Sequence, residues 1–239
     1  MQRKEGFIDF IGYKTWYVIY GELKDGVNTL LGLHGGPGYP HNYLENLSEL
    51  TKSGIPVVLY DQLGCGNSDK PDNPSLWTPE LFVEEIDAVR NALGLRPVDI
   101  LGHSWGGSLA IEYLLTKPKG VGKLILHSPL IDSHLWVQEA EKLKDTLPAE
   151  IAATMRKHER AGTTDSEEYV NAYQVFKENF VVRAKPYPEK ATEADEAASQ
   201  QVYVTMWGPN EAIATGTLKD WSAISRLSEL NLPYTYNFW

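Results

Sequence analysis

In VDILGHSWGGSLAIEYLL, residues 98–115, a short apolar run leads into the pattern Gly-x-Ser-x-Gly. Residues 98–101 predict a buried strand, and residues from about 107 to 116 predict a helix. A serine between them stands on a sharp turn, which needs small neighbours and aims the first amides of the helix at a developing oxyanion. The pattern therefore predicts that Ser104 is a nucleophile; a plain turn serine is the alternative.

A second glycine-rich turn, HGGPG at residues 34–38, follows the apolar run 29–33. Its glycines let the backbone come close to a reacting carbonyl, and Pro37 stiffens the loop. We expect the Gly36 amide to join the Trp105 amide as an oxyanion hole. Glycine is also the default turn residue, so this loop indicates an oxyanion hole only because the serine turn occurs in the same chain.

Strand-like and helix-like segments alternate through the first half of the chain. Apolar runs that end in glycine-rich or polar turns lie at 29–33, 57–60, 98–101 and 123–127, and helix-like stretches lie at 43–52 and 79–93. Thr78 is a suitable N-cap for the second helix, since Pro79 takes the favoured first position. The alternation predicts an α/β fold with a mostly parallel sheet covered on both faces. The opening segment 7–23 alternates in polarity and predicts an antiparallel hairpin.

After residue 129 the strands vanish and charged amphipathic helices take over. Four aromatic side chains of this part fall on one helical face: Tyr169, Tyr173, Phe176 and Phe180. Packing between helices is the simpler interpretation of this stripe, and lining of a pocket is the alternative. Strand-like character returns at about 230–233. The sequence therefore predicts a sheet core at 1–129, a helical cap at 130–222 and a return to the core at 223–239.

The composition limits the partners of the protein. The formal net charge is -10 and no cluster of Lys and Arg occurs, which argues against nucleic acid or an anionic membrane and favours cationic small molecules. Cys65 is the only cysteine, so no internal disulfide can form. The first residues hold no apolar run of signal-peptide length, and no run approaches the roughly 20 apolar residues of a membrane span. We therefore expect a cytoplasmic protein; its oligomeric state is open.

Four motifs together resemble the proline iminopeptidase (prolyl aminopeptidase) family of the α/β-hydrolase fold. They are LHGGPG at 33–38, YDQLGCGNSD at 60–69, GHSWGG at 102–107 and MWGPNEA at 206–212. The resemblance extends over nearly the whole chain. It implies hydrolysis of an N-terminal residue, often proline, from small peptides or amino-acid amides through an acyl-enzyme, with no metal and no cofactor.

The same resemblance assigns roles to particular residues. It makes Ser104 the nucleophile of a serine hydrolase and gives the oxyanion amides to Gly36 and Trp105. It also matches Glu211 to an acidic residue that holds the free amino group of the substrate. Without the resemblance, Glu211 would be taken for a solvated surface carboxylate.

The second motif, at 60–69, contains polar residues and the single cysteine. Asp61, Gln62 and Asp69 are expected to shape the turn after a strand, because short polar side chains bond readily to nearby backbone. Cys65 lies between two glycines with no base motif nearby. This setting favours a structural role for the thiol over a nucleophilic one.

The partners of the serine are harder to place. A serine hydroxyl needs a histidine that takes its proton and a carboxylate that orients this histidine. After Ser104 the chain has only three histidines, namely His127, His134 and His158. None of them lies in a loop beyond a final sheet strand, and Asp132 is an alternative acid.

By the family resemblance, the acid should follow a strand that begins near Pro233, and the histidine should come some tens of residues later, both beyond Trp239. We therefore expect a C-terminally truncated chain that lacks the final strands and helices of the fold. For want of the triad Asp and His, we expect it to be inactive or nearly so. One extra nucleotide after the Pro233 codon would explain the ending, since the shifted frame permits Thr-Leu-Ile-Thr-Phe-Gly; a natural terminus is the alternative.

Two other functions stay open at this point. An esterase or lactonase of the same fold would use the same serine turn, because that turn serves any acyl transfer. A truncated fragment without catalytic activity would not use the serine turn at all. Recognition of a free amino group separates the peptidase from the esterase.

Overall fold

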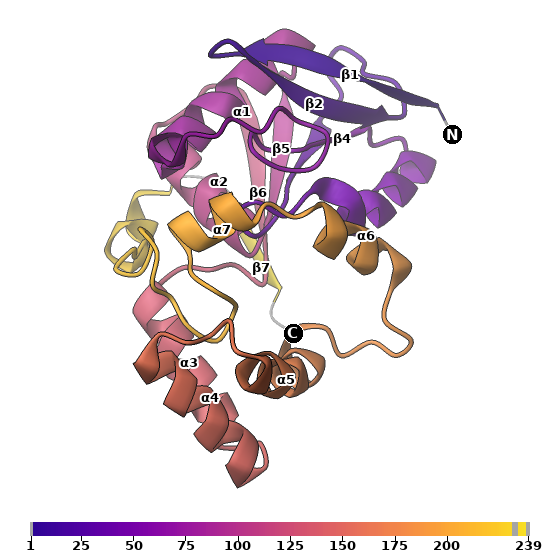
Figure 1. The fold of residues 1–239 in the computed structure, drawn as a ribbon. Helices are drawn as coiled ribbons and strands as arrows, with labels where there is room; N and C mark the ends of the chain where they lie inside the picture. Colours follow the sequence, from indigo (N-terminus) through magenta and orange to yellow (C-terminus); the bar gives the residue numbers. More distant parts are fainter. Residues whose placement is uncertain (1, 231–233, 238–239) are drawn as a thin grey trace.

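The computed structural model describes residues 2–230 and 234–237, and a mixed sheet lies at its centre (Figure 1). The strands are β1 (Arg3–Phe10), β2 (Tyr13–Tyr20), β3 (Thr29–Leu33), β4 (Val57–Tyr60), β5 (Val98–His103), β6 (Val121–His127) and β7 (Tyr234–Asn237), in the order β1-β2-β4-β3-β5-β6-β7. The pairs β1–β2 and β2–β4 are antiparallel, whereas the pairs that join β4, β3, β5, β6 and β7 are parallel. The predicted mostly parallel sheet and opening hairpin are confirmed.

Helical segments cover both faces of this sheet. In the first half of the chain they are η1 (His41–Ser53), η2 (Pro74–Leu76), α1 (Pro79–Leu93) and α2 (Trp105–Leu115). Because side chains alternate along a strand, Leu31 shares one buried cluster with Ile86 of α1, while Leu30 shares another with Leu44 of η1. The central strands are therefore buried on both sides, which explains their continuous apolar sequences.

Local signals set the ends of α1 where the sequence predicted them. The Thr78 hydroxyl accepts a hydrogen bond from the Leu81 amide at 3.3 Å, and Gly94 ends the helix in the left-handed conformation with φ 65°. The helix-like stretch at 43–52 is also helical. It forms the 3-10 helix η1, however, and this begins earlier, at His41.

Further helices lie between residues 133 and 229, and those of residues 133–176 lie together at the bottom of Figure 1. In chain order, the helices between residues 133 and 229 are α3 (Ser133–Lys144), α4 (Ala149–Ala161), α5 (Glu167–Phe176), the π-helix η3 (Lys177–Val181), α6 (Glu189–Ala197), α7 (Gln200–Met206) and η4 (Ile224–Glu229). Tyr169 and Phe176 are buried in a cluster of their own with Met155 of α4, so most of the aromatic stripe packs between helices. Tyr173 packs against this cluster and also lines a cavity. The division into core and cap at residues 130 and 222 remains a prediction.

The return to the sheet is visible in β7, which pairs in parallel with β6 so that Tyr234 lies opposite Leu124 and Asn237 opposite His127. Residues 231–233, where the sequence suggested the start of this strand, lie outside the described residues. Among the helices of the described part, none has the length and apolar character needed to cross a membrane.

Candidate active site

Ser104 lies on the turn between β5 and α2, as the sequence predicted. Its backbone has φ 52° and ψ -120°, a combination that L residues seldom adopt and that is typical of strained functional turns. Backbone hydrogen bonds hold the turn: the Ser104 amide donates to the His127 carbonyl at 3.2 Å, and the Leu130 amide donates to the Ser104 carbonyl at 3.1 Å. The end of β6 therefore fixes the serine at the carboxyl edge of the sheet.

The turn also needs its glycines. A Cβ built on Gly102 would overlap the backbone of Gly106, and one built on Gly106 would overlap the carbonyl of Leu33. Strand β5, helix α2 and the end of β3 approach one another too closely for any side chain at these two positions. The small residues of the Gly-x-Ser-x-Gly pattern are thus explained by packing around Ser104.

The loop after β3 comes to the same place. A Cβ added to Gly35 would lie 3.1 Å from the Ser104 Cβ, and Gly36 has φ 116°, which favours glycine. Gly36 and Ser104 line one cavity. Within residues 2–230, the amides of Gly36 and Trp105 donate to no other protein group. Unused donors beside a serine hydroxyl are what an oxyanion hole requires.

A buried carboxamide joins the two loops that carry these amides. Gln62, just after β4, accepts a hydrogen bond from the Trp105 indole Nε1 at 2.9 Å with its Oε1. Its Nε2 donates to the His34 carbonyl at 3.1 Å, and its backbone amide donates to His34 Nε2 at 2.9 Å. Gln62 therefore contacts both the HGGPG loop and the first residue of α2.

His34 is fully buried and neutral. Burial lowers its pKa to about 4, and this outweighs the opposing effect of the Asp61 carboxylate. Because Nε2 accepts from the Gln62 amide, the proton belongs on Nδ1, which lies 3.0 Å from the Gly35 carbonyl. The sequence pattern did not distinguish this histidine from an ordinary turn residue.

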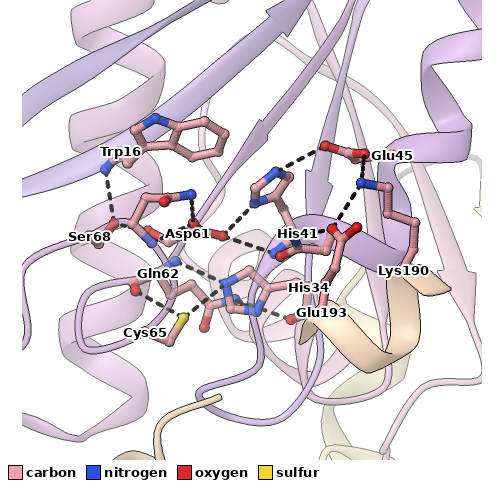
Figure 2. Close-up of polar contacts among 12 residues, drawn as sticks. Trp16, His34, His41, Glu45, Asp61, Gln62, Cys65, Ser68, Lys190 and Glu193 are labelled. Carbon is pink, nitrogen blue, oxygen red and sulfur yellow. Dashed lines mark hydrogen bonds and ion pairs between the residues drawn. The ribbon is translucent and has the colours of Figure 1, made fainter. Parts of the chain in front are cut away.

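The turn after β4 is organised by Asp61 (Figure 2). This buried carboxylate accepts from the His41 amide at 2.9 Å, from His41 Nδ1 at 2.7 Å and from the Asn67 amide at 2.8 Å. Although burial raises its pKa, the hydrogen bond from His41 and the charge of that ring hold the pKa below its usual value. The expectation that Asp61 shapes the turn is confirmed.

Two further residues of this motif are also structural. Asp69 accepts a hydrogen bond from the Lys14 amide at 2.8 Å and so ties the turn to β2. The Cys65 thiol is buried, and its Sγ donates to the Gln62 carbonyl at 3.3 Å. Burial raises the pKa of this thiol well above its ordinary value, which makes it a poor nucleophile.

A cavity of about 420 Å³ opens above Ser104 and reaches helices α5, α6 and α7. Five tyrosines line it: Tyr39, Tyr43, Tyr173, Tyr187 and Tyr203. Two carboxylates, Glu211 and Asp195, and one ammonium group, Lys177, complete the charged part of its lining. The mixture of aromatic faces and excess acid is suited to a cationic ligand.

Glu211 projects into this cavity from the loop after α7. One carboxylate oxygen accepts from the Tyr203 hydroxyl at 2.8 Å, its backbone amide donates to the Tyr173 hydroxyl at 3.4 Å, and its carbonyl accepts from the Trp136 indole at 2.9 Å. Burial raises its pKa, with the Tyr203 hydrogen bond opposing. The sequence-predicted Ser104, Gly36 and Glu211 thus line one cavity.

Asn210 fixes the loop that carries Glu211. Its Nδ2 donates to the Tyr169 hydroxyl at 2.9 Å, its Oδ1 accepts from the Ala212 amide at 2.9 Å, and its carbonyl accepts from the Trp207 indole at 3.0 Å. Sequence reasoning found Glu211 only through the family motif. The anchoring side chains come from separate helices and carried no local signal.

The far wall of the cavity contains an ion pair that sequence reasoning missed. Lys177 Nζ lies 2.8 Å from Asp195 Oδ2, and the Tyr187 hydroxyl donates to the same oxygen at 2.7 Å. Lys177 belongs to the π-helix η3 and Asp195 to α6, so the pair joins two helices across the cavity. Lys177 forms its ion pair with Asp195 and not with Glu211, although its positive charge also lowers the pKa of Glu211.

The Ser104 hydroxyl has no hydrogen-bond partner within residues 2–230. His103, adjacent in sequence, turns its Nδ1 to the Tyr43 hydroxyl at 2.9 Å, and burial lowers its pKa to about 4. His127 lies with its ring centroid 5.2 Å from that of His103.

The other candidates for a triad lie away from the serine. His134 pairs with Asp220 at 3.4 Å on the surface, and His158 bonds to the side chains of Thr163 and Glu168. Asp132, the alternative acid, caps α3 by accepting from the Leu135 amide at 2.7 Å. Across the described residues, no group of three His, Cys, Asp or Glu side chains is gathered so as to hold a metal ion.

Comparison with known proteins identifies the relatives of this chain. Residues 28–232 match the family model described as the alpha/beta hydrolase fold. The chain is 41% identical over 233 residues to a protein named proline iminopeptidase from Heyndrickxia coagulans, and this alignment covers 97% of the chain and 80% of the relative. A proline iminopeptidase from Lactobacillus helveticus is 39% identical, with coverage of 98% and 80%.

Solved structures give the same picture. The crystal structure of proline iminopeptidase from Mycobacterium smegmatis superimposes with a TM-score of 0.88 at 37% identity, covering 98% of this chain and 80% of that one. The crystal structure of VinJ superimposes with a TM-score of 0.93, also at 37% identity and with the same coverage. An N-acyl homoserine lactone degrading enzyme, Est816, is 21% identical with a TM-score of 0.65, a likeness that shows the fold alone.

Proposed function

This chain belongs to the proline iminopeptidase family of the α/β-hydrolase fold, and we propose that its site recognises the free N-terminal residue of small peptides or amino-acid amides, proline among them. The observation that carries the proposal is the shared cavity of Ser104 and Glu211. One group is suited to attack a carbonyl, and the other is suited to hold the adjacent ammonium.

The proposed chemistry starts with the substrate ammonium at the Glu211 carboxylate. This places the scissile carbonyl beside Ser104, whose oxygen attacks the carbon while the amides of Gly36 and Trp105 stabilise the oxyanion. The proton lost by Ser104 passes through a general base to the departing amine, which leaves an acyl-enzyme; water then hydrolyses this ester, releases the N-terminal residue and restores the serine hydroxyl. An oxyanion donor of this kind is worth about 2.7–4 kcal/mol in mutational tests.

We also propose that the 239-residue chain itself turns over little substrate. The Ser104 hydroxyl lacks a base within residues 2–230, and the two histidines of the helical region are bound elsewhere. Loss of a working triad costs about a million-fold in turnover and leaves binding and oxyanion stabilisation in place. Binding is therefore the sharper test of this site.

Calorimetric titration with prolinamide and with N-acetylprolinamide tests the amine site. Prolinamide should bind, and acetylation or the substitution Glu211→Gln should each weaken binding at least about tenfold, because a partly buried carboxylate or its partner is lost. Equal affinity for the two ligands would instead favour an esterase or lactonase. Release of nitroaniline from proline p-nitroanilide, with Ser104→Ala as control, measures the residual turnover.

A further inference from the structure

We propose that Gln62 is a positioning residue that sets the relative placement of the two oxyanion amides. The inference rests on the proposed function, because it assumes that the amides of Gly36 and Trp105 form the hole. It adds a role for a side chain that otherwise only shapes a turn.

The carboxamide of Gln62 links two segments that do not follow one another in the chain. Its Oε1 accepts from the Trp105 indole at 2.9 Å, and its Nε2 donates to the His34 carbonyl at 3.1 Å. Trp105 carries one proposed oxyanion amide on its own backbone. His34 stands two residues before Gly36, which carries the other.

Only a side chain with one acceptor and one donor at this spacing can make both contacts. His34, Gln62 and Trp105 are all fully buried, so water cannot replace a lost partner without entering the core. A carboxylate at position 62 would keep the acceptor for Trp105 and lose the donor to His34. An apolar side chain would lose both.

The backbone amide of Gln62 strengthens the link by donating to His34 Nε2 at 2.9 Å. On the other side of the loop, the Gly35 amide donates to the Tyr43 hydroxyl at 2.5 Å. The loop is thus held immediately before Gly36 from two directions. The Tyr43 hydroxyl also reaches the serine turn, through His103 Nδ1 at 2.9 Å. The Gln62 carboxamide differs in that it bonds to Trp105, a residue that itself carries a proposed oxyanion amide.

Positioning of this kind matters for catalysis because oxyanion donors act at short range. A displacement of about 1 Å can cost about 100-fold in rate, and complete loss of a donor costs about 100- to 1,000-fold. Gln62 does not touch the substrate cavity. Its loss should therefore weaken tetrahedral, anionic adducts and spare ground-state ligands.

Two ligands separate these effects without any need for turnover. Prolinamide occupies the amine site and forms no oxyanion. Proline boronic acid forms a bond from Ser104 Oγ to boron, releases the serine proton to solvent and leaves a tetrahedral boronate anion whose B–OH oxygens can enter the oxyanion hole. The affinity of each ligand is measured for the wild type, Gln62→Leu, Gln62→Glu and Tyr113→Phe.

Tyr113 is the matched control because it is buried on α2, the helix that begins at Trp105. Its hydroxyl bonds to Asp87 and Arg90, and Tyr113 does not line the cavity. Gln62→Leu should weaken the boronate adduct about 10- to 100-fold and prolinamide by less than about twofold. Gln62→Glu should also weaken the boronate adduct more than it weakens prolinamide binding. Tyr113→Phe should leave both affinities unchanged.

If Gln62→Leu does not melt cooperatively, Trp105→Phe replaces it, since that change removes the indole donor and keeps the backbone amide.

Each other outcome is decisive. Equal weakening of both ligands by Gln62→Leu, or the same pattern in Tyr113→Phe, would mean that Gln62 is merely structural. Unchanged boronate affinity would overturn the positioning role and leave the proposed function intact. If the wild type binds prolinamide but no boronate, the proposed oxyanion hole and this inference are both wrong. If it binds neither ligand, the proposed function is wrong as well.

Discussion

Ser104 and Glu211 line the same cavity, the first from the strained turn after β5 and the second from the loop after α7. The serine is held by backbone bonds to the end of β6. The carboxylate is held by side chains of several helices. A nucleophile from the sheet and an amine-binding group from the helical region are thus combined, and the following predictions test each part.

Ser104→Ala should leave prolinamide affinity within about twofold and abolish the adduct with proline boronic acid, because only the nucleophilic oxygen is removed. Calorimetry and boron-11 NMR measure the two ligands. Ser108→Ala is the control: Ser108 lies on α2, the helix that follows Ser104, and its hydroxyl donates to the Leu130 carbonyl, so this variant should lose some stability and keep the adduct. An adduct that survives in Ser104→Ala would place the nucleophile elsewhere.

Prolinamide binding should weaken as the pH falls. The decline should begin at a pH above the one at which an ordinary glutamate takes up its proton. The amine needs the ionised form of Glu211, and burial raises the pKa of this carboxyl above its usual value. As the pH falls through this raised pKa, the carboxyl takes up a proton and the attraction is lost. Titrations between about pH 4 and 8 should show the decline in the wild type, and the much weaker binding of Glu211→Gln should show none.

Stability should decrease as the pH rises from about 4.5 to about 8, because of Glu85. Its buried carboxyl bonds to the Thr15 hydroxyl and the Leu63 amide, and burial raises its pKa to about 8. The group ionises in the unfolded chain near 4.5 and in the folded chain near 8, so its contribution is complete below the first value and lost towards the second. The slope is at most about 1.4 kcal/mol per pH unit.

Thermal melts across this range check the Glu85 prediction. Glu85→Gln is neutral in both states and should not show the decline, whereas Glu84→Gln changes an exposed neighbour and should follow the wild type. Parallel curves for the wild type and Glu85→Gln would contradict the assignment.

Helix α6 should loosen locally when Lys190 is replaced. Lys190 pairs with Glu45 of η1 at 3.1 Å and with Glu193 at 2.8 Å (Figure 2). The Asn42 side chain donates to Glu193 at 3.0 Å. Such exposed pairs contribute about 0.2–1 kcal/mol each. Lys190→Met should therefore speed hydrogen exchange in α6 by up to about fivefold, with little change in the melting temperature.

The exposed pair of Lys142 and Glu139 on α3 offers a control for this measurement. Lys142→Met removes a similar pair that does not join α6 to η1, so exchange in α6 should stay at the wild-type rate. If exchange in α6 is the same for Lys190→Met as for the wild type, the contacts in Figure 2 do not hold the helix.

The strands and helix α1 were predictable because their signals are local. The run at 57–60 is apolar throughout and forms β4 with the predicted bounds, and Thr78 and Gly94 mark the ends of α1. The helix at 43–52 was less well predicted: it is a 3-10 helix and starts at His41, whose amide bonds to Asp61, a residue 20 positions further along the chain.

The α/β alternation, the serine turn and its glycines follow from the amino-acid sequence, since hydrophobic period and backbone sterics act between neighbours along the chain. The hydrogen bonds that join Gln62 to His34 and Trp105, and Tyr203 to Glu211, arise only in the folded protein. The same holds for Lys177 and Asp195. These contacts depend on side-chain directions after the helices pack on the sheet, and a hydrogen bond between distant residues leaves no periodic trace in either segment.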